Sequence, residues 1–116
     1  MTLQHVSLET RPADADAEVA WWAKLGFHEV APPGSLGERA RWVQRGRTQI
    51  HLLLTDEPVV MPRGHAAVVC EDADRVVPAL GDVAEREAHW GARRWYARTP
   101  AGHLVEVMAA PPPIDD

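Results

Sequence analysis

The sequence repeats one order of expected secondary structure. His5–Leu8 and His65–Val68 both read as strands, they begin 60 residues apart (positions 5 and 65), and each precedes an Asp-initiated helical segment. Two later apolar strands, Gln49–Leu52 and Leu104–Val107, match at an offset of 55 residues (positions 51 and 106). A strand–helix–strands unit that occurs twice in 116 residues predicts a two-fold internal repeat.

Periodicity and turn residues divide the chain, which we interpret as one domain, into module one (1–54), a linker (55–64), module two (65–108) and an extended tail (109–116). The expected strands are Leu3–Leu8, Arg39–Arg45, Gln49–Leu54, His65–Cys70, Ala84–Ala88, Arg93–Arg98 and Leu104–Met108. A helix of about three turns is expected between Pro12 and Gly26. The second, Asp72–Leu80, should be short or distorted because Pro78 removes a backbone hydrogen bond.

Composition excludes several classes of partner. Twelve Lys and Arg against 17 Asp and Glu give a net charge of −5, and no basic run is present, so we expect no nucleic-acid partner. No apolar stretch approaches the roughly 18 residues of a membrane span, and the start of the sequence lacks a signal-peptide layout, so we expect no membrane association and a cytoplasmic protein. Cys70 is the only cysteine, which excludes an intramolecular disulfide and a cysteine-based metal cluster within one chain.

Four polar residues lie inside otherwise apolar strands, at matching places in the two halves: His5, His51, His65 and Glu106. Taken singly, a strand histidine is usually a hydrogen-bonded core residue or an exposed one, and Glu106 would face solvent. Taken together they indicate a metal site. A carboxylate buried among valines is costly unless it is paired or bound to a metal, and neutral imidazoles are common ligands of divalent cations.

Five segments carry a resemblance to a known family: Leu3–Leu8, Trp21–Phe27, Gln49–Leu52, Gly64–Val68 and Thr99–Glu106. In this order the chain resembles the vicinal oxygen chelate superfamily, which includes glyoxalase I, extradiol dioxygenases, fosfomycin-modifying enzymes and bleomycin resistance proteins. The resemblance implies an α+β fold of two βαβββ modules, whose curved mixed sheets surround a central site and carry helices on the outer face. It also implies a homodimer, in which a site is built within one chain or from one pair of ligands from each chain.

The resemblance further implies a divalent metal ion (Fe, Zn, Ni, Mn or Co) that is chelated by two neighbouring oxygens of a small-molecule substrate. His5, His65 and Glu106 match the two-His, one-carboxylate set of the family's dioxygenases and thiol transferases. His51 stands where glyoxalase I-like members carry a glutamate, so it is either a fourth ligand or a general base. His51 and Glu106 are therefore the expected catalytic residues, and a neutral imidazole at position 51 argues against plain lactoylglutathione lyase activity.

Two other functions stay open. One is a metal-free protein that sequesters an antibiotic or toxin, as bleomycin resistance relatives do, and the acidic charge would favour a cationic ligand. Those relatives generally lack the full set of metal-binding side chains. The other is a structural or regulatory dimer that kept the fold and lost its chemistry.

Further residues are candidates for a pocket wall, although core or interface packing is an equal alternative for each Trp: Trp42, Trp90, Trp95, Tyr96, Arg93 and Arg94. Arg93 and Arg94 alternate across their strand, so at most one faces the site. The remaining histidines, His28, His89 and His103, lie near turns and are expected to be exposed.

Overall fold

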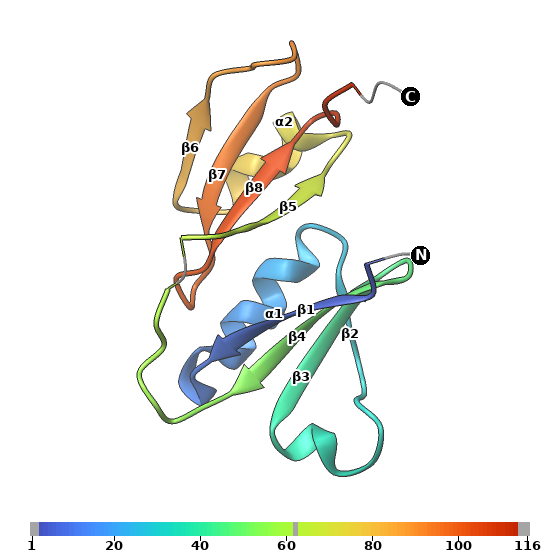
Figure 1. Ribbon diagram of the computed structural model, residues 1–116, viewed down its shortest axis with the longest axis vertical. Coiled ribbons are helices and arrows are strands. Elements are labelled where there is room, and N and C mark those ends of the chain that lie inside the picture. Colours follow the sequence, from blue (N-terminus) through green and yellow to red (C-terminus); the bar gives the residue numbers. More distant parts are fainter. Residues whose placement is uncertain (1–2, 62, 114–116) are drawn as a thin grey trace. The chain divides into compact units, whose positions relative to one another are not determined.

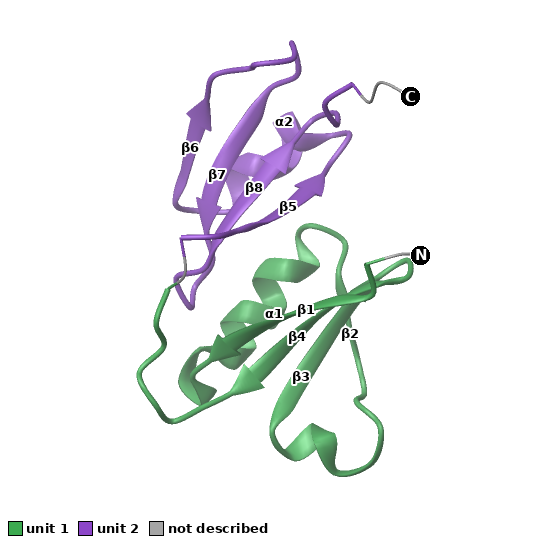
Figure 2. Ribbon diagram, in the orientation of Figure 1, with its two compact units in different colours: residues 1–61 green, residues 62–116 purple. Residues whose placement is uncertain are grey.

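The computed structural model describes residues 3–61 and 63–113. The chain divides into two compact units, Met1–Met61 and Pro62–Asp116 (Figure 2). Each unit contains a strand, an α-helix and three further strands, in that order (Figure 1). The predicted α+β architecture of two βαβββ modules is therefore confirmed.

The first unit forms one mixed four-stranded sheet. Its elements are β1 (His5–Thr10), α1 (Ala15–Ala23), β2 (His28–Val30), β3 (Ala40–Arg45) and β4 (Thr48–Leu54), with 3-10 turns at Pro12–Asp14 and Gly34–Glu38. The strand order is β1-β4-β3-β2, in which β1 runs parallel to β4 and the other pairs are antiparallel.

The second unit repeats this topology. Its elements are β5 (Ala66–Val69), α2 (Ala73–Val76), a 3-10 turn (Val77–Ala79), β6 (Val83–Arg86), β7 (Arg94–Arg98) and β8 (Leu104–Met108). The strand order is β5-β8-β7-β6, and β5 runs parallel to β8.

Alternation along the central strands gives each sheet one buried face and one open face. In the first unit the side chains of Val43, Ile50 and Leu52 are at most 3% exposed, and Trp22 of α1 is fully buried. In the second unit Val105 and Val107 are fully buried. We call the buried face of each sheet its helix face. The open face of each sheet carries the side chains of the opposite parity, which include His51 and Glu106.

Both helices end where the sequence predicts a break. Gly26, three residues beyond α1, has φ +86°, a left-handed conformation in which glycine carries no steric penalty. In the second unit α2 is only four residues long, and the chain continues as a 3-10 turn that contains Pro78. The prediction of a short, distorted second helix is confirmed, since proline cannot donate the hydrogen bond that would continue it.

Strand β2 is absent from the sequence-based prediction. It has only three residues and directly precedes Ala31-Pro32-Pro33, so no alternating run marks it. Its conformation comes instead from tertiary pairing, because His28, Glu29 and Val30 lie opposite Gln44, Val43 and Trp42 of β3.

The predicted strand Leu104–Met108 matches the structure, and the other predicted strands differ from it only at their ends. The first strand runs from His5 to Thr10 rather than from residue 3 to residue 8. Pro111–Pro113 of the predicted tail have no regular secondary structure, and residues 114–116 lie outside the described residues. None of the helices formed by residues 3–61 and 63–113 has the length and apolarity needed to cross a membrane.

Candidate functional site

Three aromatic rings stack on the open face of the first sheet. His51 of β4 lies opposite Trp42 of β3, and the two ring centroids are 3.9 Å apart with an angle of 2° between the planes. The ring of His5, from β1, covers the other side of His51 at 3.9 Å and 13°. His51 is consequently only 8% exposed, although it lies on the open face.

A directional chain of hydrogen bonds sets the tautomer of His51. The side-chain amide of Gln44 donates to the backbone carbonyl of Gly46 (3.1 Å), so its oxygen is free to accept from the amide of Gln49 (2.7 Å). The oxygen of Gln49 then faces Nε2 of His51 at 2.7 Å and accepts a hydrogen bond from it. Nε2 of the neutral imidazole therefore carries the proton, and Nδ1 keeps its lone pair.

Sequence reasoning missed both glutamines. The signal was present in the alternation, because Gln49 lies two residues before His51 on the same face of β4, and Gln44 lies directly opposite Gln49.

The environment of His51 favours its neutral form. Burial lowers the pKa of His51 below its ordinary value of 6.5, and the nearby positive charge of protonated His5 lowers it further. Nδ1 of His5 itself lies 2.6 Å from the side-chain oxygen of Gln4. At neutral pH His51 thus offers an unprotonated nitrogen, which a metal ligand or a general base requires.

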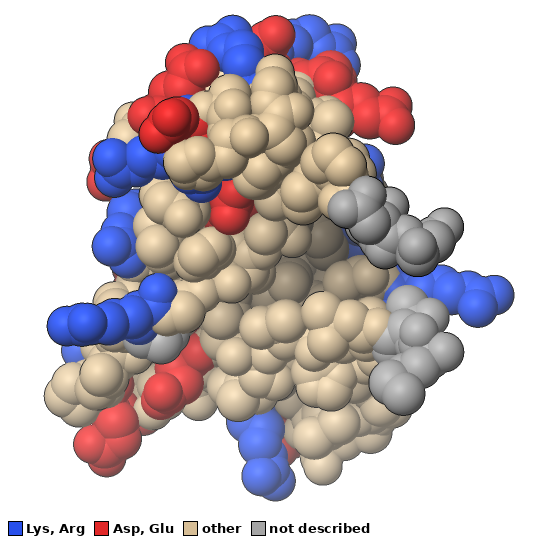
Figure 3. Space-filling view, turned by 45° about the horizontal axis from the view of Figure 1, so that its top comes forward, with Lys and Arg blue, Asp and Glu red and all other residues tan. Residues whose placement is uncertain are grey.

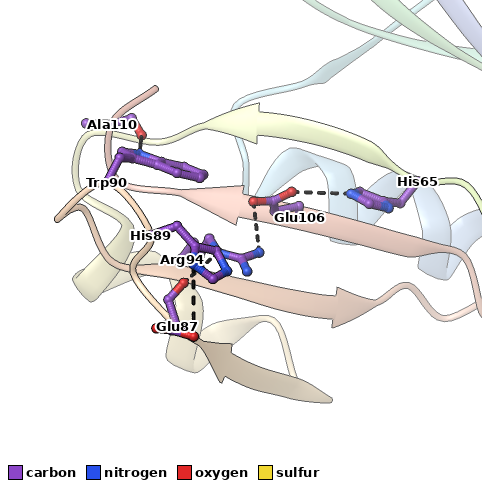
Figure 4. Close-up of polar contacts among 7 residues, drawn as sticks. All are labelled: His65, Glu87, His89, Trp90, Arg94, Glu106 and Ala110. Atoms are coloured by element: carbon purple, nitrogen blue, oxygen red, sulfur yellow. Dashed lines mark hydrogen bonds and ion pairs between the residues drawn. The ribbon is translucent and has the colours of Figure 1, made fainter. Parts of the chain in front are cut away.

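The second sheet places a carboxylate where the first places His51. Glu106 of β8 lies opposite Tyr96 of β7 and is 8% exposed. Its Oε1 lies 3.2 Å from Nε2 of His65, the residue that precedes β5, and its Oε2 accepts a hydrogen bond from Arg94 at 3.3 Å (Figure 4). The ring of His65 contacts that of Tyr96 edge-on, with centroids 5.1 Å apart.

Arg94 connects this carboxylate to the loop that joins β6 to β7. Its Nε donates to the backbone carbonyl of Glu87 (2.8 Å), and its guanidinium lies 5.9 Å from the ring of Trp90. Trp90 donates in turn to the carbonyl of Ala110 (2.9 Å) (Figure 4). A hydrogen bond with Tyr96, and then the charge of Glu106, raise the pKa of Arg94, so it stays cationic.

The two sheets therefore repeat one three-residue arrangement. In the first sheet, Ser7 of β1 lies opposite His51, and His5 stands two residues before Ser7. Trp42 lies opposite His51 on the other neighbouring strand, β3. In the second, His65, Glu106 and Tyr96 hold the same register positions.

The structure brings the four predicted site residues together as two pairs, His5 with His51 and His65 with Glu106. Within residues 3–61, and likewise within residues 63–113, no group of three or more His, Cys, Asp or Glu side chains is arranged to hold a metal ion. Each unit thus carries two of the four predicted residues.

The candidates for a pocket wall divide between the two faces. Trp42, Tyr96 and Arg94 contact the predicted site residues. Trp95 is 5% exposed and lies on the helix face, where Arg93 contacts its ring and pairs with Asp74 and Glu85 instead of Glu106.

The expectation that His103 is exposed is wrong, whereas His28 and His89 are exposed. His103 is only 4% exposed, because it shares the parity of Val105 and Val107 and so points toward the helix face. The turn before it is closed by hydrogen bonds in both directions between His103 and Thr99.

Basic and acidic side chains are interspersed on the face of the molecule drawn in Figure 3. This mixture accompanies the formal net charge of −5.

No family model and no curated protein matches the sequence. Among solved structures, a protein from Bacillus anthracis described as belonging to the glyoxalase family superposes with a TM-score of 0.79, at 22% identity and with 93% of each chain covered. The chain has the vicinal oxygen chelate fold. Two further structures share this fold. The oxidase ChaP-H2 has a TM-score of 0.73 at 15% identity, covering 97% of this chain and 95% of its own. A bleomycin-binding protein in complex with bleomycin has a TM-score of 0.62 at 18% identity, covering 95% of this chain and 100% of its own.

Proposed function

We propose that the protein is a metal-dependent enzyme of the glyoxalase and dioxygenase type, in which His5, His51, His65 and Glu106 hold one divalent ion. The substrate is a small molecule that chelates this ion through two neighbouring oxygens. The observation that carries the proposal is the repeated register: each open face presents two ligand-type side chains at equivalent positions, beside an aromatic residue on the neighbouring strand.

The donor set fits a transition metal. Three imidazoles and one carboxylate are typical ligands of Fe, Zn, Ni, Mn and Co, and the lowered pKa of His51 leaves its imidazole unprotonated at neutral pH. Because imidazole lone pairs lie in the ring plane, the nearly parallel rings of His5 and His51 cannot both point at one ion. Metal binding therefore requires at least one of these two rings to turn.

A bound ion would supply Lewis-acid stabilisation of negative charge that develops on substrate oxygens. The remaining roles belong to the chain. Gln49 holds His51 with the proton on Nε2, so Nδ1 can either bind the ion or accept a proton from substrate. Arg94 partly offsets the charge of Glu106 and fixes one of its two oxygens.

Metal content and calorimetry test this proposal. We expect purified protein to contain a transition metal, and chelator-treated protein to rebind it with one ion per four-ligand set. His5→Ala and Glu106→Ala should each weaken rebinding at least tenfold, because each removes a ligand from a different unit. His28→Ala, which removes an exposed histidine of the first sheet, is the matched control and should rebind normally. Absence of metal, or normal rebinding by both ligand variants, would contradict the proposal.

One observation favours the alternative, a metal-free protein that sequesters a toxin or antibiotic. Trp42, His51 and His5 form a continuous ring stack, and Glu106 is already engaged by both His65 and Arg94. Such a surface suits a flat ligand bound by stacking. Binding of bleomycin that is unchanged in chelator-treated protein, without turnover, would support this function over the enzymatic one.

We also propose that the protein is a cytoplasmic homodimer. The dimer is tested by light scattering of the purified chain, and a monomeric mass would exclude a site shared between two chains.

A further inference from the structure

Two arginines face each other on the open side of the second sheet. Arg86 of β6 lies directly opposite Arg94 of β7, and their guanidinium carbons are 5.6 and 5.5 Å from the ring centroid of Tyr96. Like charges directly opposite each other destabilise an antiparallel pair. Glu106 compensates Arg94, but among residues 3–61 and 63–113 no carboxylate forms an ion pair with Arg86. A chain with a net charge of −5 thus leaves a cation uncompensated at this position.

A hollow of about 350 Å³ opens beside this cation. Arg86 and Arg98 line it together with the ring of Tyr96 and the apolar side chains of Ala84 and Leu104. Arg98 uses one nitrogen to donate to the carbonyl of Gly102 (3.1 Å), which leaves other N–H groups of its guanidinium for a ligand.

Acidic groups do not neutralise this hollow. Asp82 is the acidic residue in its described lining, and no ion pair joins Asp82 to Arg86 or Arg98 within the described part of the chain. Two guanidinium groups, an aromatic ring and small apolar side chains are the features that recognise an anionic group attached to an apolar body.

We propose that this hollow binds the carboxylate or phosphate-type oxyanion of a small organic ligand, with Arg86 and Arg98 as its cationic contacts. Tyr96, Ala84 and Leu104 contact the apolar part next to that group. The inference does not depend on the metal proposal, because neither arginine is a proposed ligand of the ion. If both hold, the hollow anchors an anionic substrate next to Glu106, since Tyr96 lies opposite that residue.

Titration of the 116-residue chain with benzoate and with phenylphosphonate, followed by backbone amide NMR, tests the proposal. We expect saturable shifts centred on Arg86, Tyr96 and Arg98, and no such shifts with the neutral analogue benzamide. Arg86→Gln should weaken binding about tenfold or more, the range for loss of a charge-assisted hydrogen bond. Arg86→Lys should retain part of it, because the ammonium keeps the charge and loses the bidentate geometry.

Arg47→Gln is the matched control, since it removes the same charge from an exposed turn of the first unit. It should bind both anions within twofold of wild type, as should chelator-treated wild type, which separates this site from a metal centre. Equal binding of benzoate and benzamide, absence of saturable shifts with both anions, or equal affinity of Arg86→Gln and Arg47→Gln would overturn the proposal. A normal amide spectrum of Arg86→Gln without ligand establishes that a lost affinity does not reflect unfolding.

Discussion

The imidazole of His51 lies between two nearly parallel rings, and this position controls its protonation. In chelator-treated protein we expect NMR titration to give His51 a pKa below 6.5. His5→Ala should raise that pKa toward the ordinary value, because it removes a like charge and also uncovers one side of the ring to water. His28→Ala should leave it unchanged. A pKa of His51 that does not respond to His5→Ala would show that neither effect operates.

The lowered pKa of His51 makes the free energy of unfolding depend on pH. Because folded His51 has the lower pKa, the unfolded chain binds more protons, and acidification through about pH 6.5 favours unfolding until the folded pKa is reached. The slope contributed by this residue is at most about 1.4 kcal/mol per pH unit. We expect His51→Asn to lose less stability than wild type between about pH 7.5 and about pH 5.5 in urea unfolding followed by tryptophan fluorescence. Parallel curves for the two proteins would contradict this expectation.

Gly46, in the hairpin between β3 and β4, has a backbone conformation that strains any residue with a Cβ. Its φ is +59°, and a Cβ there would meet no atom within 4 Å, so backbone strain alone opposes substitution. We expect Gly46→Ala to lower the free energy of unfolding by about 1 kcal/mol. Gly37→Ala, at a site with no positive φ and equally open space, is the control and should be close to neutral. Equal urea midpoints for the two variants would refute the strain argument.

At the level of elements, one ion-pair cluster occurs in both units. In the first, Arg41 of β3 pairs with Glu29 of β2 and Asp16 of α1. In the second, Arg93 pairs with Glu85 of β6 and Asp74 of α2. Each cluster ties the helix to the strand at one edge of its sheet, on the helix face.

The central arginines of the two clusters differ in solvent exposure, which predicts different strengths. The side chain of Arg41 is 27% exposed and that of Arg93 is 52% exposed, so water screens the charge of Arg93 more. We expect Arg41→Met to lower the free energy of unfolding by about 1 kcal/mol, and Arg93→Met to lower it less. Both losses should shrink in about 1 M salt. Urea unfolding at two salt concentrations measures them, and a larger loss for Arg93→Met would contradict the exposure argument.

The long elements were predictable from the sequence because their side chains alternate over enough residues. Leu104–Met108 was predicted at its observed bounds, and Pro78 indicated the short second helix. Local pattern does not specify a three-residue strand, so the sequence does not predict β2. The turn beside His103 suggests an exposed side chain, but the parity that His103 shares with Val105 places it on the buried face.

The ion-pair clusters could not be predicted in the same way. Arg41 and Asp16 stand 25 residues apart in the sequence, and only the pairing of β2 with β3 and the packing of α1 bring such residues together. The internal repeat is the one sequence signal for these clusters. In each half an Asp of the helix, a Glu of the next strand and an Arg at or beside the strand after it follow one another along the chain.

For the whole molecule, the internal repeat predicted more than any single motif. It identified the two modules and the four ligand-type residues, and the structure adds that these residues hold equivalent register positions in the two sheets. Binding of a common ion by both pairs stays a prediction. Such an ion needs ligands from both units, because each unit has only two of the four proposed ligands.

Hydrogen exchange of chelator-treated protein, with and without added transition metal, tests whether the two units bind the same ion. An ion held by both pairs should protect the amides of β1 and β4 together with those of β5 and β8, and at about 100 times its dissociation constant it should stabilise the chain by about 2.7 kcal/mol. Glu106→Ala should then reduce the protection in β1 and β4, although the residue belongs to β8, and His5→Ala should reduce it in β5 and β8. His28→Ala should reduce neither. Protection confined to one unit, or lost only in the unit that carries the substitution, would mean that the two pairs do not share an ion.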